Sequence, residues 1–327
     1  MSCQTLAFPL FKVPLLVIQC VIRKMPLEEL FCLSLCSSMS KTSVKVLNMK
    51  AAYIDFNISG EFKIRPIKSG LAGRSLALEF TSPNLLEEFI QKRASLNWKT
   101  FMEHFMDIFH CEKLNFLFLE GCEVYDIENF KSEFDVASVI IESKVPFAYS
   151  QKIFENLRPS TFLSIGLDQS NSEEFREKVL SQEVQTMRLE CASYEDLLAS
   201  KSKNIELPAS EISTSNFNDF IKKWMSGELN PNLESLAIQV SKRDLSEEYQ
   251  QEVLAGIEHE SVPSEQILKV SKHVAESFMW GAVRETHGRF EIRNVDGTKA
   301  FIILNSFRNS MYFKLLVYQP YYTHDCR

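Results

Sequence analysis

The chain has 327 residues, of which 45% are hydrophobic and 24% are charged, close to the averages for a soluble globular protein. This composition excludes a chain that is disordered throughout and a low-complexity fibre, and the length suits two or three domains. The formal net charge of −7 argues against non-specific binding of nucleic acid over the whole surface.

The charge is distributed unevenly along the chain. Residues 1–50 carry six Lys and Arg but only two acids, a net charge of +4, which leaves −11 for the remaining residues. We therefore expect a small basic module followed by a large acidic one. The eight cysteines include no Cys-x-x-Cys pair and no Cys/His cluster with zinc spacing, so we predict reduced cysteines in a reducing compartment and no metal.

An apolar run begins the chain's first predicted helix. The run Val13–Ile22 is too short to span a bilayer and is not followed by a cleavage site, which predicts a cytoplasmic and/or nuclear protein without membrane contact. Pro14 suits the first turn of a helix. Because this helix is apolar all round, it must be covered on all sides, which a fifty-residue unit cannot do alone.

Two more helices are predicted after Pro26, one from Glu28 and one over Ser40–Lys50. The three helices are either a subdomain that packs on the rest of the chain or a docking module whose surplus apolar surface belongs to a partner protein.

The same segment resembles an F-box, in residues 8–22 (FPLFKVPLLVIQCVI), in Met25 and Leu30, and in residues 33–37 (LSLCS). The resemblance implies that residues 8–48 form a three-helix F-box that binds the acidic Skp-type adaptor of an SCF (Skp–cullin–F-box) ubiquitin ligase, and through it a cullin. The residues implied to contact the adaptor are Pro14, Leu15, Val17, Ile18, Val21, Ile22, Met25, Leu30 and Leu33.

A repeat follows in the body of the chain. Six segments share the apolar spacing of the leucine-rich-repeat strand, and their starts lie on average about 24 residues apart, within the range of such repeats. They start at Leu114, Val136, Phe162, Val184, Ser202 and Leu233. The segments between them carry helix signals over Ser172–Leu180 and Ser193–Ala199, and between Ser215 or Asn216 as N-cap and Gly227 as the closing residue.

The common phase predicts which side chains share a row across a parallel sheet. One buried row is predicted at Leu117, Val139, Ile165, Met187, Ile205 and Leu236, with a second at Leu119, Ile141, Leu167, Leu189, Leu207 and Ile238. The opposite, concave row is predicted at Phe118, Ile140, Gly166, Arg188, Glu206 and Ala237. Its mixed chemistry suits a protein-binding surface, so Phe118, Ile140, Arg188 and Glu206 are candidate substrate contacts.

Strands are predicted on both sides of the repeats. Ala52–Ile58 and Phe62–Ile67 read as a hairpin, with a further strand in residues 76–81. Arg289–Arg293 and Lys299–Leu304 flank Asp296-Gly297, a strong hairpin signal, and Tyr312–Tyr318 would add a third strand.

The predicted fold is therefore α/β: a three-helix F-box at 8–48, a connector at 49–112, an irregular leucine-rich-repeat-like solenoid at 113–258, and a helix with a β-meander at 259–327. The strands at both ends would cap the solenoid.

A second resemblance lies within these repeats. Residues 215–227, residues 230–238 and residues 290–300 resemble, in order, the F-box-associated domain of type 2, which would begin at about residue 185. In that family the domain follows an F-box and is taken to bind the proteins to be ubiquitinated.

No catalytic motif or cofactor-binding loop was found, and the six histidines share no spacing. We therefore predict a protein that is not an enzyme and has no cofactor. The favoured hypothesis is a substrate-recruiting adaptor subunit of an SCF ubiquitin ligase with an unknown protein substrate. The alternative is a leucine-rich-repeat-like scaffold unconnected to ubiquitin.

Overall fold

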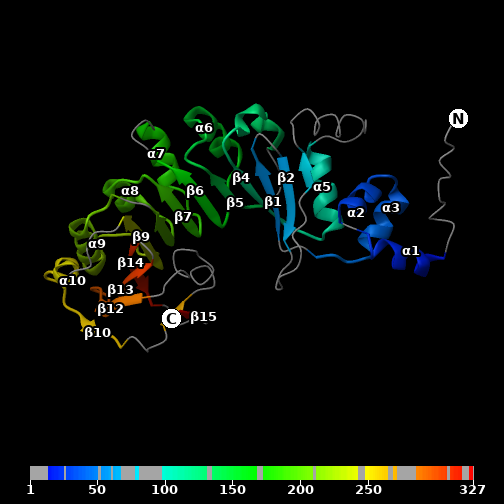
Figure 1. Ribbon diagram of the computed structural model, residues 1–327. Coiled ribbons are helices and arrows are strands. Elements are labelled where there is room, and N and C mark those ends of the chain that lie inside the picture. Colours follow the sequence, from blue (N-terminus) through cyan, green and yellow to red (C-terminus); the bar gives the residue numbers. More distant parts are fainter. Residues whose placement is uncertain are drawn as a thin grey trace. The chain divides into compact units, whose positions relative to one another are not determined.

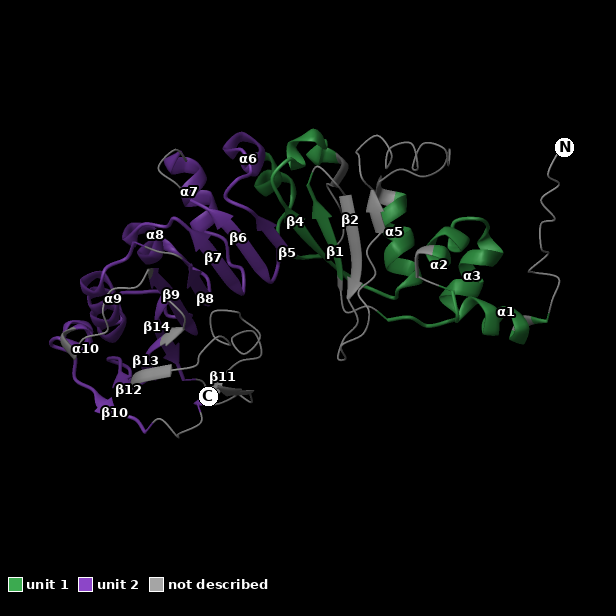
Figure 2. Cartoon of the chain, viewed as in Figure 1, with its two compact units in different colours: residues 1–137, 152–158 green, residues 138–151, 159–327 purple. Residues whose placement is uncertain are grey.

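A computed structural model describes residues 14–25, 27–50, 53–59, 62–67, 78–80, 98–130, 135–167, 172–208, 211–241, 247–263, 268–270, 285–307, 310–318 and 324–326. The chain divides into two compact units (Figure 2). Unit 1 comprises residues 1–137 and 152–158, and unit 2 comprises residues 138–151 and 159–327. Residues 8–13 of the predicted F-box segment lie outside the described residues.

Unit 1 begins with three short helices, α1 (Leu15–Ile22), α2 (Leu27–Ser34) and α3 (Ser38–Lys45) (Figure 1). Pro14 is the N-cap of α1. Ser37 caps α3 by accepting a hydrogen bond from the backbone N–H of Ser40, 3.1 Å away. The third helix is shorter than the predicted Ser40–Lys50, because it ends at Lys45. Beyond this end, Asn48 adopts a positive φ of 50°, which does not belong to a right-handed helix. We call these three helices the head.

The strands of unit 1 form a sheet in the order β4-β1-β2-β3. The strands β1 (Tyr53–Ile58), β2 (Phe62–Ile67) and β3 (Leu78–Phe80) are antiparallel, as the sequence predicted, whereas β4 (Lys113–Phe118) runs parallel to β1. The other elements of unit 1 are α5 (Trp98–Ile108) and two 3-10 turns, η2 (Cys122–Val124) and η3 (Ile127–Phe130).

The side-chain phase predicted for β4 is wrong. Phe116 and Phe118 are fully buried, whereas Leu117 is half-buried. The reason lies in the neighbouring strand, where Phe56 pairs with Phe116 and the two rings stack with centroids 5.4 Å apart. Because successive residues of a strand point to opposite faces, burying the two phenylalanines turns Leu117 the other way.

A run of parallel strands joined through helices makes up much of unit 2, although residues 135–137 of its first strand and residues 152–156 of its first helix belong to unit 1. The strands β5 (Asp135–Ile141), β6 (Phe162–Gly166), β7 (Thr186–Glu190), β8 (Asn204–Leu207) and β9 (Ser235–Ser241) pair in this order. The connecting helices are α6 (Phe147–Asn156), α7 (Glu173–Leu180), α8 (Tyr194–Ala199) and α9 (Thr214–Ser226). Helices α7, α8 and α9 lie on one side of the strands (Figure 1).

The register confirms most of the predicted rows and corrects one. Val139 pairs with Leu163, Leu163 with Met187, Met187 with Ile205, and Ile205 with Leu236. Leu163 thus takes the place predicted for Ile165, which pairs with Leu189 instead. A shift of two residues keeps Ile165 on the same buried face, because the side-chain period of a strand is two.

The helix boundaries follow side-chain caps. Ser172 and Ser193 cap α7 and α8, as predicted. The N-cap of α9 is Ser213, however, rather than Ser215 or Asn216: Ser213 accepts from the N–H of Asn216, whose side chain accepts from the N–H of Ser213 in return. This reciprocal capping box fixes the start of the helix two or three residues earlier than the sequence suggested.

An antiparallel meander continues the sheet beyond β9, as predicted. Strand β14 (Ser310–Val317) pairs with β9, and β13 (Lys299–Phe307), β12 (Glu285–Arg293) and β10 (Glu260–Ser261) follow in order. Strands β11 (Leu268–Val270) and β15 (His324–Cys326) form a separate antiparallel pair. Helix α10 (Glu247–Leu254) contacts α9, and the rings of Phe217 and Tyr249 pack on that of Phe313.

The chain is thus a mixed α/β protein that begins with short helices. Among the described residues, no helix has the length and apolar character needed to cross a membrane.

Candidate interaction surfaces

One side of α1 faces the interior of the head. Ile18 is 5% exposed and Ile22 is fully buried, and both pack in a cluster with Leu30 and Val44. Residues four apart in a helix lie on the same side, so this side of α1 completes the head's own core.

The other side of α1 is apolar and uncovered. Leu16 is 75% exposed, Val17 46% and Val21 43%, and Cys20 between them is exposed too. Their spacing places all four along one side of the helix. The exposed Arg23 and Lys24 follow directly. We call the side formed by Leu16, Val17, Cys20 and Val21 the α1 strip.

The residues predicted to contact the adaptor therefore divide into groups. Pro14, Val17 and Val21 are exposed, and Met25 and Leu33 are half-buried. Ile18, Ile22 and Leu30 are buried inside the head, so they stabilise the helices rather than offer surface. The side chain of Leu15 lies outside the described part of the chain.

The head packs on α5 through aromatic side chains. Phe31 of α2 is 1% exposed, stacks on Phe105 with ring centroids 4.1 Å apart, and meets Phe101 edge-on at 5.7 Å. The ring of His104 also lies edge-on to Phe31, at 5.9 Å. Helix α5 thus supplies the core that closes the inner side of the head.

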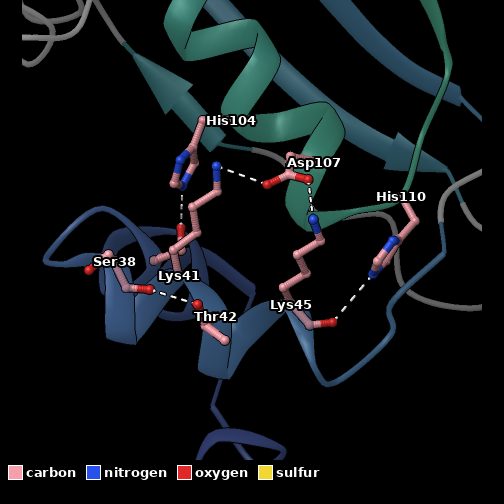
Figure 3. A network of polar contacts seen from close by, with 8 residues as sticks. Ser38, Lys41, Thr42, Lys45, His104, Asp107 and His110 are labelled. Atoms are coloured by element: carbon pink, nitrogen blue, oxygen red, sulfur yellow. Dashed lines mark hydrogen bonds and ion pairs between the residues drawn. The ribbon is translucent and has the colours of Figure 1, made fainter.

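Polar contacts also join the head to α5 (Figure 3). Asp107 of α5 accepts from Lys41 at 2.9 Å and also from Lys45, both on α3. Burial alone would raise the pKa of the Asp107 carboxyl, but the two lysines outweigh it and hold that pKa below its ordinary value. His104 Nε2 lies 2.7 Å from the Ser34 hydroxyl, which itself donates to the carbonyl of Phe31.

The predicted concave row is largely closed. Phe118 is fully buried and offers no contact surface, which corrects its assignment as a candidate substrate contact. Arg188, Glu206 and Ala237 are neighbours across β7, β8 and β9, as predicted. However, Glu206 is 4% exposed and Ala237 fully buried, while Ile140 and Arg188 are half-buried.

Part of the cover over this face comes from a neighbouring strand. Leu268 of β11 packs in one cluster with Ala237, Phe301 and Tyr312, and Val262 packs against it. The face of β9, β13 and β14 is therefore an interior of unit 2, and Glu206 at its border is not available to a partner in this conformation.

A pocket of about 460 Å³ opens instead where β6, β7, β8 and β9 begin. Each of the loops that precede these strands contributes to its lining. The lining residues are Ser160, Glu183, Val184, Gln185, Leu198, Ala199, Ser200, Lys201, Lys203, Asn230, Pro231 and Asn232. We call it the loop pocket.

A second pocket of about 400 Å³ shares Asn230 and Pro231 with the first. Its other walls come from the end of α9 and from the turn between β12 and β13, including Trp224, Gly227, Asp296 and Lys299. These residues lie in two of the segments that carry the second sequence resemblance, residues 215–227 and residues 290–300. The N–H of Val295 donates to the carbonyl of Met225 at 2.8 Å and joins them.

Asn230 holds the loop between the two pockets in place. Its Nδ2 donates to the carbonyl of Ser202 at 3.0 Å, and its Oδ1 accepts from the N–H of Asn232 at 2.9 Å. The sequence resemblance includes residues 230–238 but did not identify the pockets, because their walls come from segments far apart in the chain.

In the part of the chain that the structure describes, no three His, Cys, Asp or Glu side chains are grouped so that they could hold a metal ion. His110, which adjoins Cys111, has its Nε2 3.3 Å from the carbonyl of Lys45 and so contacts the head.

Comparison with known proteins gives one result. Residues 176–238 match the family described as F-box associated. No curated protein and no solved structure matches the chain. The matched segment runs from α7 to β9 and contains most of the loop pocket. Residues 176–238 are therefore an F-box associated domain.

Proposed function

We propose that the chain is the substrate-recruiting subunit of an SCF ubiquitin ligase and catalyses no reaction itself. The observation that carries the proposal is the F-box associated domain at 176–238 behind a basic three-helix head whose first helix has an uncovered apolar side. In this proposal the head is the F-box, and the α1 strip binds the Skp-type adaptor, which connects to a cullin. Unit 2 binds the protein substrate.

The physical role is to raise effective concentration. A chain that binds the adaptor at one surface and a target at another makes ubiquitin transfer quasi-intramolecular. The uncovered apolar α1 strip supports this role, because scattered apolar residues are normal on a surface but a continuous strip points to a partner. Arg23 and Lys24 beside it suit an acidic partner.

We also infer that β5–β9 with their helices are an irregular leucine-rich-repeat-like array, ended by the β-meander. Their parallel pairing in chain order supports this. The site of action would be the cytoplasm and/or nucleus. The alternative, an interaction scaffold unconnected to ubiquitin, shares the same array and differs only in what the head binds.

The test is a quantitative binding assay between the full-length chain and a purified Skp-type adaptor. Val21→Asp should weaken binding by at least about 30-fold, because a charge in a desolvated apolar interface is unpaired and interface anchors are worth about 2 kcal/mol or more. Val124→Asp is the matched control: it changes an exposed valine of unit 1 that is outside the head, and it should bind as the parent does.

Ile18→Asp provides a second comparison. Because Ile18 is buried in the head, this variant should unfold the head and lose binding together with helical signal, whereas Val21→Asp should lose binding with the melting temperature unchanged. No adaptor binding by the parent chain, or full binding by Val21→Asp, would refute the assignment of the head and favour the scaffold.

A further inference from the structure

The loop pocket has walls that suit a peptide. Leu198, which is half-buried, supplies apolar contact, whereas Val184 is 3% exposed and adds little surface. Gln185 and Asn232 also line the pocket, and their side-chain amides can both donate to and accept from a peptide backbone.

The charge of the lining is opposite to that of the chain. Lys201 and Lys203 are exposed on the loop before β8, and Glu183 is the one acid among the lining residues. Lys203 Nζ forms an ion pair with the carboxylate of Glu234 at 3.6 Å, whereas Lys201 has no ion-pair partner among the described residues. Residues 51–327 carry a net charge of −11, so this pocket is a basic site on an acidic body.

We propose that the loop pocket binds an acidic segment of the protein substrate, with Lys201 and Lys203 contacting its carboxylate or phosphate groups and Gln185 and Asn232 its backbone. The identification of the ligand as the substrate rests on the proposed function, whereas the preference for an acidic peptide does not. The surrounding negative charge disfavours a nucleic acid, whose phosphates would extend beyond the pocket over that body.

The experiment measures binding of the full-length chain to pools of biotinylated ten-residue peptides. In each pool one central position is fixed as Asp, Glu, phosphoserine, Asn or Lys, and the other positions are degenerate. The acidic pools should bind about threefold more strongly than the Asn pool, the effect expected of an exposed ion pair. Comparing the Asp and Glu pools with the phosphoserine pool distinguishes a carboxylate from a phosphate ligand.

Two variants and a control connect the preference to the pocket. Lys201→Glu should abolish the preference for acidic pools, and Lys203→Gln should reduce it. Lys222→Glu makes the same charge change as Lys201→Glu at an exposed position of α9 outside the lining, and should retain it. Melting curves establish that the variants fold.

Equal binding of acidic and Asn pools by the parent chain would overturn the proposal, as would an acidic preference that survives Lys201→Glu or is lost equally in Lys222→Glu. Adaptor binding is measured in parallel and should be the same in Lys201→Glu as in the parent. A failure of the peptide result alone therefore refutes the acidic ligand, whereas a failure of adaptor binding refutes the proposed function.

Discussion

Phe31→Ala tests whether α5 is part of the head's folding unit. The side chain of Phe31 is 1% exposed and is enclosed by Phe101, Phe105 and His104. Truncating a buried phenylalanine costs about 3–5 kcal/mol. In a unit of this size each kcal/mol lowers the melting temperature by about 2–4 °C, so we expect a decrease of roughly 6–20 °C.

The assay combines thermal unfolding with hydrogen exchange. The melting temperature of unit 1 should fall by that amount, and amides of α5 should exchange faster together with those of α2, because both helices lose the same core. Phe31→Leu, which keeps most of the apolar volume, should have a much smaller effect. Val21→Ala, a truncation at an exposed site of α1, is the control and should leave both measurements unchanged.

The result that would refute this reasoning is selective loosening. If Phe31→Ala accelerated exchange in α2 but left α5 as protected as in the parent, the aromatic contacts would not couple the two helices. A loss below about 1 kcal/mol would lead to the same conclusion, because it is too small for the truncation of an enclosed ring.

Three further predictions concern charge, thiol chemistry and backbone conformation. Asp107→Asn should lower the free energy of unfolding by about 1 kcal/mol, because it removes two half-exposed ion pairs. Since the pKa of Asp107 is lowered in the folded state, the stability difference between parent and variant should be complete above the ordinary pKa of 3.8. It should vanish in an unfolding series as the pH falls through the lowered pKa of the folded state. Burial raises the pKa of the Cys122 thiol to about 12. In the native state, iodoacetamide at pH 8 should therefore alkylate the exposed Cys191 and spare Cys122. Equal labelling of the two cysteines in peptide mass spectra would contradict the burial of Cys122. Gly227→Ala should lower the unfolding free energy more than Gly297→Ala. Both glycines have φ near +80°, so an alanine at either position costs roughly 1–2 kcal/mol of stability, but only at Gly227 does the added Cβ approach another side chain, the Val295 Cγ1 at 3.3 Å. Equal losses in denaturant unfolding would show that Val295 moves away freely.

The sequence predicted the elements better than the faces they present. In residues 114–119 every position except Asn115 is apolar, so the leucine template and its one-residue shift bury similar apolar area. The stacking of Phe116 on Phe56 decides between them, and that contact joins strands about sixty residues apart. In residues 162–167 the phase was right and only the register was not, because Leu163, Ile165 and Leu167 all suit the same face.

For the candidate surfaces, too, the sequence did not predict which side chains are exposed. The all-round apolar α1 predicted a surplus of apolar surface, but its contacts with Leu30 and Val44 decide that Ile18 lies inside and Val21 outside. The loop pocket had no sequence signal, since the loops that form it precede four different strands. Local patterns specify periodicity, whereas the choice among equivalent apolar positions depends on packing between distant segments.

The change of strand direction at β9 limits how this array can grow. One edge of β9 pairs in parallel with β8 and the other in antiparallel with β14. A duplicated strand–helix unit inserted after β9 would have to displace β14 and the whole meander behind it, whereas a unit inserted between β6 and β8 would find parallel partners on both sides. We therefore expect chains built on this plan to vary in length through gain or loss of internal units, with β9 and its meander retained as the fixed end of the sheet.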